Sequence, residues 1–107
     1  MSDLLIYPVV LETVALLREV LVVLERLDPD LANQLRRAAA SMALNASEGA
    51  YSRGGNKKVR YHSALGSARE ALSCIEVAVA FGHVVRVDEE IASRMRRIIG
   101  TFTNLAR

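Results

Sequence analysis

Cysteine, proline and tryptophan are scarce in this chain, whose 107 residues include one cysteine, two prolines and no tryptophan. A single cysteine excludes a disulfide within the chain, and Cys74 lies in an alanine- and valine-rich segment where we expect a small core residue. The scarcity of proline, in a composition rich in alanine and leucine, favours helices. The length is that of one domain, and no linker-like stretch divides residues 1–107.

Long hydrophobic runs are also missing. The apolar segments at residues 4–6 and 9–11 are preceded by Asp3 and interrupted by Glu12, with no basic leader or cleavage site beside them. No run approaches the roughly 18 apolar residues that suggest a membrane span. We therefore expect a soluble, cytoplasmic protein that does not contact membranes.

The first predicted helix runs from about Tyr7 or Pro8 to Leu27, after a helical or extended lead-in at residues 2–6. Pro8 suits only a first turn, where its missing N–H is not needed. Apolar residues cover more than half of this helix, and even Val22 falls on its polar side, whereas an ordinary surface helix has a narrower apolar face. We expect burial from two sides, with a second copy of the chain covering one of them. The alternative is a monomer in which this helix is simply very hydrophobic.

The second predicted helix begins at Asp28 and Pro29, a capping residue followed by the residue that suits the first helical position. It continues to about Ser52. The segment from Ser52 to Asn56 contains two glycines and is predicted to be a turn, with Asn56 capping the next helix.

The third predicted helix spans about Lys57 to Phe81, and Gly82 stands where a helix-ending glycine belongs. Residues 84–87 link it to a fourth helix, which Asp88 caps. Short connections make sequential helices antiparallel. The expected fold is therefore all-α, an antiparallel up-down-up-down four-helix bundle that assembles as a homo-oligomer.

The net charge of +2 conceals a division along the chain. Residues 1–30 hold six acidic and two basic residues, a net −4, while residues 31–69 hold seven basic residues against Glu48, a net +6. Tyr51 and Tyr61 flank the most basic part of the second block, which contains Arg53, Lys57, Lys58 and Arg60. Lysines at a helix N-terminus oppose the helix dipole, which indicates a role other than stability.

These four basic residues form a candidate phosphate-binding surface. Glycines beside them leave the backbone accessible, and the two tyrosines could stack on unpaired bases. The alternative is a solvated turn that only keeps the protein soluble. Several copies of the turn on one rim of an oligomer would strengthen its field.

Polar residues share a face on the second and third predicted helices. On the second helix, spacings of 4, 4 and 3 residues separate Arg37, Ser41, Asn45 and Glu48. On the third helix, a spacing of 3 residues separates Ser67 and Glu70. We expect them to pair across a helix interface and to fix its register. Acid–base catalysis is the alternative, but the set lacks a nucleophile, a metal-ligand cluster and a poised histidine.

Three motifs in this region resemble a known family. They are Leu35-Arg36-Arg37-Ala38-Ala39, Asn45-Ala46-Ser47-Glu48-Gly49 and Gly66-Ser67-Ala68-Arg69-Glu70. In order and spacing they are similar to the four-helix bundle family of proteins encoded in bacterial 23S rRNA intervening sequences. The resemblance covers residues from about 30 to 83. Ala43 departs from that family's pattern, where a proline is common.

The same bundle is similar to the accessory variability protein of diversity-generating retroelements, which binds nucleic acid and partners a reverse transcriptase. The resemblance implies a barrel-like homopentamer. It also implies that Arg36, Arg37, Asn45, Glu48, Ser67 and Glu70 correspond to the family's recurrent positions. Together with Ser41, we expect these residues to form a structural polar network that serves packing and assembly.

The expected function is that of a non-enzymatic oligomeric module, without cofactor or metal, that binds RNA or DNA backbone through the four basic residues. The alternative is a structural or adaptor protein that acts only through protein contacts, such as docking a reverse transcriptase or another partner.

Overall fold

The computed structural model describes residues 3–107, with side chains from Leu5 onward, and the regular elements in that range are all α-helices. Five are present: α1 (Asp3–Leu16), α2 (Arg18–Leu27), α3 (Pro29–Tyr51), α4 (Gly54–Ala80) and α5 (Glu89–Leu105). The predicted all-α class is confirmed. The predicted number of helices is wrong, because the first expected helix is divided in two.

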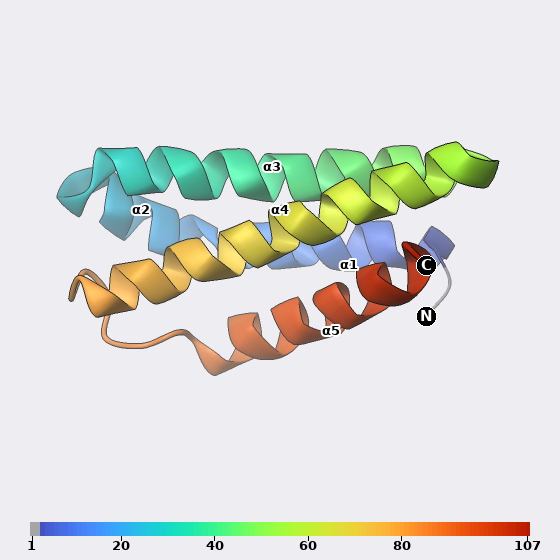
Figure 1. Cartoon of the computed structure of the whole chain (residues 1–107). Helices are drawn as coiled ribbons and strands as arrows, with labels where there is room; N and C mark the ends of the chain where they lie inside the picture. The colour runs from blue at the N-terminus through green and yellow to red at the C-terminus, as the bar shows by residue number, and fades with distance from the viewer. Residues whose placement is uncertain (1–2) are drawn as a thin grey trace.

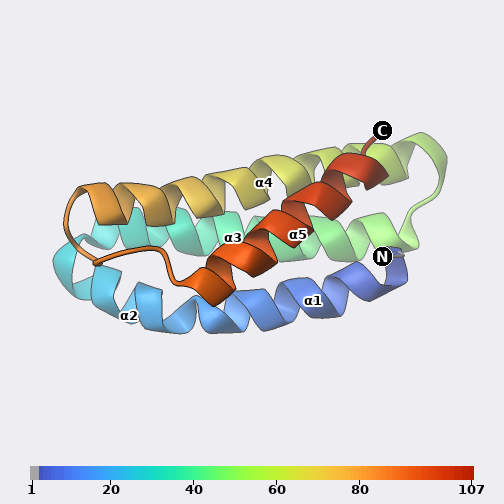
Figure 2. The same cartoon turned by 90° about the horizontal axis from the view of Figure 1, so that it is seen from below.

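The helices pack side by side into an elongated body whose Cα atoms extend over 43 × 23 × 19 Å (Figures 1 and 2). α3 contacts α1, α2 and α4, while α5 contacts α4 and α1. The α3–α4 connection lies at one end of the body, together with the start of α1 and the end of α5. We call this the α3–α4 end. The α2–α3 and α4–α5 connections lie at the opposite end.

The first predicted helix is interrupted at Leu17, a fully buried residue. The Leu17 N–H donates to the carbonyl of Val14, 3.0 Å away and one residue nearer than in an α-helix. Thr13 supplies a local cause, because its buried hydroxyl donates to the Val9 carbonyl at 2.8 Å and such contacts bend helices. The interruption was missed because no proline or glycine marks it.

The predicted start of this helix is also wrong. α1 begins at Asp3, so Pro8 lies inside the helix and not in its first turn. The expected lead-in at residues 2–6 is helical from Asp3 onward, and its first residue lies outside the described residues. Val22 is 61% exposed, as its place on the polar side predicts.

Two predicted helix starts are confirmed by their capping contacts. The Asp28 carboxylate accepts a hydrogen bond from the Leu31 N–H at 3.1 Å, with Pro29 in the first helical position. The Asp88 carboxylate accepts from the N–H groups of Glu90 and Ile91 at 3.0 and 3.2 Å. Both carboxylates satisfy N–H groups that a helix cannot pair internally.

The predicted helix-ending glycine is confirmed as well. Gly82 has φ +81°, a left-handed conformation, and its N–H donates to the Val79 carbonyl at 2.9 Å. The His83 N–H donates to the Ala78 carbonyl, also at 2.9 Å. This pair of bonds is a Schellman motif, which ends α4 and satisfies two of its last carbonyls.

The turn before α4 is shorter than predicted. Only Ser52 and Arg53 separate α3 from α4, and Gly54 starts α4 with φ +60°. Asn56 is therefore inside the helix and does not cap it, contrary to the prediction. The glycines that predicted a turn instead form the first residues of α4.

Buried side chains from the five helices, together with Leu17 between α1 and α2, form one continuous core. In this core Tyr61 of α4 and Phe102 of α5 are in contact, with 6.0 Å between their ring centroids. Gly49 on α3 lies against the Tyr61 ring, since a Cβ at this position would be 2.8 Å from Cζ. The fully buried large side chains are Tyr61, Phe102, Ile6, Leu17, Leu24, Leu35, Met42, Ile75, Met95, Ile98 and Val10.

Candidate functional site

The four predicted nucleic-acid contacts lie together at the α3–α4 end. Arg53 is in the connection, and Lys57, Lys58 and Arg60 follow in the first two turns of α4. Three of the side chains are exposed, and Lys57 is half-buried. The position of the four residues thus agrees with a surface role, while their binding to nucleic acid stays a prediction.

The Arg60 charge is paired with a carboxylate of the same chain. The Arg60 guanidinium reaches from α4 to the Glu48 carboxylate on α3, with 2.9 Å between Nε and Oε2. The two side chains are 48% and 54% exposed. An ion pair this accessible to water adds little stability, about 0–1 kcal/mol. Its main effect is to reduce the local positive charge and to join the basic turn to the polar residues of α3.

The N-terminus of α4 adds to the positive field at this end. Arg53 precedes the helix in an extended conformation, with no capping hydrogen bond from its side chain, and the first turn contains no acidic residue. Gly54 and Gly55 are exposed, with open space where a side chain would project. The first N–H groups of a helix lack internal partners and carry partial positive charge. This end can therefore attract an anion with both backbone and side chains.

Only one of the two flanking tyrosines is available for stacking. Tyr51 is 84% exposed at the end of α3. Tyr61 is fully buried between Gly49 and Phe102, so the prediction that it stacks on bases is wrong. The sequence places Tyr61 near the basic residues, but the helix turns its ring inward.

The predicted polar network is formed in part. The hydroxyls of Ser41 on α3 and Ser67 on α4 are 2.7 Å apart, which pairs the two helices at mid-length. The Asn45 amide donates to the Ser41 carbonyl at 2.9 Å and approaches its hydroxyl at 3.2 Å. The Ser41–Ser67 contact ties the register of α3 to that of α4, as expected of a structural network, and the Asn45 amide supports Ser41 from within α3.

The two arginines of the network have different surroundings. Arg36 points away from α4, forming an ion pair with Glu25 on α2 and a 2.9 Å hydrogen bond to Asn33. Arg37 and Glu70 line an open groove of about 570 Å³ between α3 and α4, together with Gln34, Ala38, Ser41 and Ser67. Within the described residues, no hydrogen bond or ion pair joins Arg37 to Glu70.

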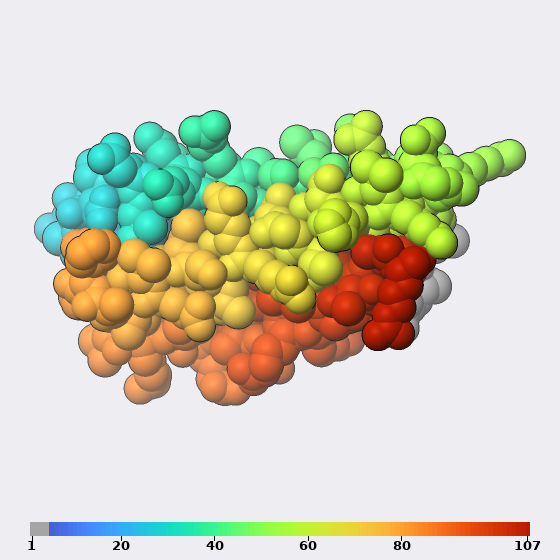
Figure 3. All heavy atoms as spheres, viewed as in Figure 1, coloured from blue at the N-terminus to red at the C-terminus, as the bar shows by residue number. Residues whose placement is uncertain are grey.

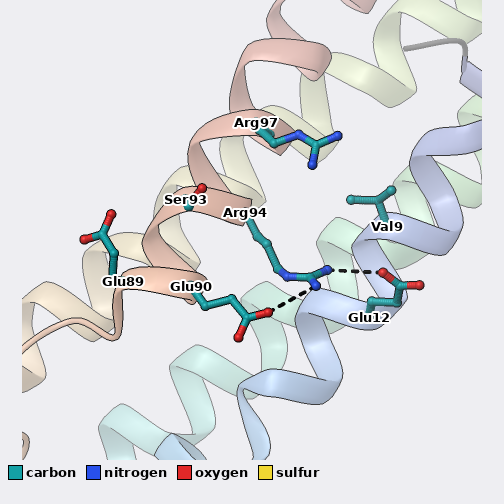
Figure 4. A pocket seen from close by; sticks show the side chains of 7 residues that line it. All are labelled: Val9, Glu12, Glu89, Glu90, Ser93, Arg94 and Arg97. Atoms are coloured by element: carbon teal, nitrogen blue, oxygen red, sulfur yellow. Dashed lines mark hydrogen bonds and ion pairs between the residues drawn. The ribbon is translucent and has the colours of Figure 1, made fainter.

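A second groove, of about 610 Å³, lies between α1 and α5 (Figure 4). Arg94 on α5 crosses it to Glu12 on α1, 3.1 Å away, and also contacts Glu90 at 3.2 Å. These hydrogen bonds, first that to Glu12, raise the pKa of Arg94. Arg97 extends over the same groove toward Val9. The sequence did not single out Arg94, whose partner Glu12 is 82 residues away.

The opposite end of the molecule is acidic. Asp28 and Asp30 lie at the start of α3, and three further acidic residues, Asp88, Glu89 and Glu90, lie at the start of α5. The His83 imidazole donates to the Asp28 carboxylate, with 3.2 Å between Nε2 and Oδ2, and this contact links the two connections. The sequence did not predict this contact, since the residues are 55 positions apart.

Reactive groups are few in the described part of the chain. Cys74 is 4% exposed, as predicted for a core residue, and burial and then the nearby Glu70 raise the pKa of its thiol. Among residues 3–107, no three histidine, cysteine, aspartate or glutamate side chains are grouped to hold a metal ion. Nor is any helix in this range long and apolar enough to cross a membrane.

No family model, curated protein or solved structure matches this chain. The resemblance of residues 30–83 to the family of 23S rRNA intervening-sequence proteins thus stays a prediction. Its residues nevertheless have clear structural roles, because Ser41 pairs with Ser67, Glu48 pairs with Arg60 and Gly49 accommodates Tyr61.

Proposed function

We propose that the protein is a non-enzymatic nucleic-acid-binding module whose contact surface is the α3–α4 end. The observation that carries the proposal is the uncapped N-terminus of α4, surrounded by Arg53, Lys57 and Lys58. A phosphate backbone suits this surface, because it offers repeated negative charge to both the helix dipole and the side chains. Few contacts to base edges are expected, and therefore little sequence preference.

The distribution of charge over the molecule supports an end-on approach. The α3–α4 end is basic, and the far end holds Asp28, Asp30 and Asp88, together with Glu89 and Glu90, which are paired with Arg96 and Arg94. A body with one basic and one acidic end turns its basic end toward a polyanion during diffusion. Exposed Tyr51 lies beside the basic residues and can stack on an unpaired base.

We further propose that the chain folds and works as an up-down-up-down four-helix bundle, with α1 and α2 acting as one rod, in a homo-oligomer. Assembly is supported by large apolar side chains that are exposed on α1 and α2, namely Leu5, Leu11, Val22 and Leu27. A second copy would cover them, as expected for a helix that is buried from two sides. A homopentamer is the state that the family resemblance implies. Several basic ends in one assembly would raise the affinity for a long polyanion.

The proposal is tested by fluorescence anisotropy of a structured RNA and of a DNA duplex with nuclease-treated protein, over a range of salt concentrations. A variant in which all four basic residues, Arg53, Lys57, Lys58 and Arg60, are changed to Gln is expected to lose binding. Each phosphate contact contributes about −0.9 to the slope of log affinity against log salt on a duplex, so four contacts give a slope of about −3.6.

A matched control removes the same charge elsewhere, by changing Arg18, Arg26, Arg69 and Arg86 to Gln. It is expected to bind nearly as well as the unaltered protein, because these exposed residues lie outside the α3–α4 end. Equal losses in the two variants would show that net charge alone governs binding. Absence of binding at low salt would refute the proposal.

The second candidate is an adaptor that acts through protein contacts alone. Exposed apolar side chains near the acidic end favour it, with Phe81 at 69% and Val85 at 93% exposure. Exposed apolar groups that gather in one place mark interaction surfaces. A partner that co-purifies with the protein, and is lost when both residues are changed to Ser, would support this function, while binding of nucleic acid would be absent.

A further inference from the structure

α3 and α4 lie side by side on one face of the molecule (Figure 3). The charged residues on this outer face of the two helices follow a particular order. The Ser41–Ser67 contact joins the two helices at mid-length, at the end of the α3–α4 groove described above. One helical turn away, toward the acidic end, α3 presents Arg37 and α4 presents Glu70. Toward the basic end the order is reversed, since α3 presents Glu48 and α4 presents Arg60.

This order makes the surface complementary to itself. A second copy, turned by 180° about an axis across the groove, lays its α3 antiparallel on the first α3. Arg37 of each copy then faces Glu48 of the other, and Glu70 faces Arg60. The same rotation places the basic end of one copy beside the acidic end of the other. Local charges and the charge of the whole body therefore favour the same arrangement.

The groove is also open and large enough for such a contact. Arg37 and Glu70 form no ion pair with each other among the described residues, although both line the groove. Leu44 on the exposed side of α3 is 63% exposed and supplies an apolar contact near the middle. The outer face of α3 and α4 is about 34 Å long and, for two helices side by side, roughly 20 Å wide. Its area is therefore about 700 Å² per copy. Stable interfaces bury about 800 Å² per partner.

We propose that the outer face of α3 and α4 binds the same face of a second copy of this chain through a two-fold contact, with Arg37 against Glu48 of the second copy. The contact is separate from the exposed apolar residues of α1 and α2, and goes beyond the assembly proposed above. It produces a dimer of single chains, or pairs two rings if the chain also forms a pentamer.

The test is a charge-reversal complementation, followed by sedimentation equilibrium. In Arg37→Glu, a glutamate faces Glu48 of the second copy, and in Glu48→Arg, an arginine faces Arg37. Each variant alone is expected to associate about tenfold more weakly, so that its mass falls toward half of the unaltered protein's. A mixture of the two restores the mass, because every facing pair is again opposite in sign.

Charge reversals on the other edge of α4, Arg69→Glu and Glu76→Arg, are the matched controls, and both residues are exposed. They are expected to leave the mass unchanged.

If Arg37→Glu and Glu48→Arg keep the full mass, or if their mixture stays at half mass, the proposed surface is wrong even where a ring persists. A further mixture combines Arg37→Glu with Glu70→Arg. If this mixture restores the mass and the mixture with Glu48→Arg does not, Arg37 faces Glu70 of the second copy. The two-fold axis then runs along the groove, and the proposed arrangement is overturned. An unaltered protein of one-chain mass at all concentrations would remove both this contact and the proposed oligomer, while leaving the nucleic-acid test independent.

Discussion

Gly49 offers a test of the packing around the Tyr61 ring. In an exposed helix interior, Gly→Ala stabilises a protein by about 1 kcal/mol, because alanine has the higher helix propensity. At Gly49, however, the new Cβ would lie 2.8 Å from Cζ of Tyr61 and 3.0 Å from Cε1 and Cε2. These are ring atoms of a fully buried side chain that also contacts Phe102, so they have little room to move.

The clash is expected to outweigh the gain in propensity. Overpacking a core costs about 1–3 kcal/mol. Because the Tyr61 ring has little room to move, we expect the upper part of this range, about 2–3 kcal/mol. After subtraction of the propensity gain of about 1 kcal/mol, Gly49→Ala is expected to destabilise the protein by about 1–2 kcal/mol. Gly100→Ala is the matched control, since Gly100 is also inside a helix but has nothing within 4 Å of its added Cβ. That variant is expected to be more stable than the unaltered protein by about 0.5–1 kcal/mol.

Thermal unfolding followed by far-ultraviolet circular dichroism measures both variants at one protein concentration, because assembly makes Tm depend on concentration. For a domain of this size, 1 kcal/mol shifts Tm by about 4 °C or more. The two variants should therefore move in opposite directions and differ by roughly 8 °C. Equal stabilisation by both substitutions would refute the close packing of Gly49 on the Tyr61 ring.

Two further predictions concern the acidic end and the core thiol. Asp28→Ala is expected to lower the free energy of unfolding in urea by about 1 kcal/mol, because it removes the cap of the Leu31 N–H and the contact with His83. Asp28→Asn should retain most of the stability, because asparagine can also cap a helix. Equal losses in the two variants would show that the cap contributes nothing. Because burial and Glu70 raise the pKa of Cys74, the native protein should react more slowly with a thiol reagent at neutral pH than a free cysteine does, and the rate should increase with pH and on unfolding. Rapid reaction of the folded protein at neutral pH would contradict the burial.

The parts of the fold that the sequence predicted correctly depend on short-range contacts. Asp28 and Asp88 cap the helices that directly follow them, and Gly82 ends the helix that directly precedes it. Each contact is made within a few residues by a side chain or conformation specific to one residue type. Such features can be recognised without knowledge of the rest of the chain.

The errors arise where distant residues decide the outcome. Tyr61 was placed with the basic surface by its sequence neighbours, but the space beside Gly49, on another helix, accommodates its ring. The break at Leu17 lies in a run of good helix formers, and it becomes apparent only from the backbone and the Thr13 hydroxyl. Gly54 and Gly55 predict a turn from the sequence, whereas in the structure they begin α4.

The sequence predicted the location of the basic surface more accurately than it predicted the ion pairs of its side chains. The basic residues could be found by counting charges along the chain, and they lie at one end of the molecule as expected. Their partners depend on how α3 and α4 are aligned, so the sequence predicted polar pairing in general but not that Glu48 binds Arg60 or that Arg36 binds Glu25. Long side chains on a helix reach neighbours in several directions, and spacing alone does not select one of them.

The two-residue connection between α3 and α4 has a consequence for the order of folding. These helices share the most extensive contact in the molecule, and only Ser52 and Arg53 separate them in the chain. Contacts between segments so close in sequence form early, because little chain entropy is lost in bringing them together. We expect α3 and α4 to pair first as a helical hairpin, on which α1, α2 and α5 then assemble.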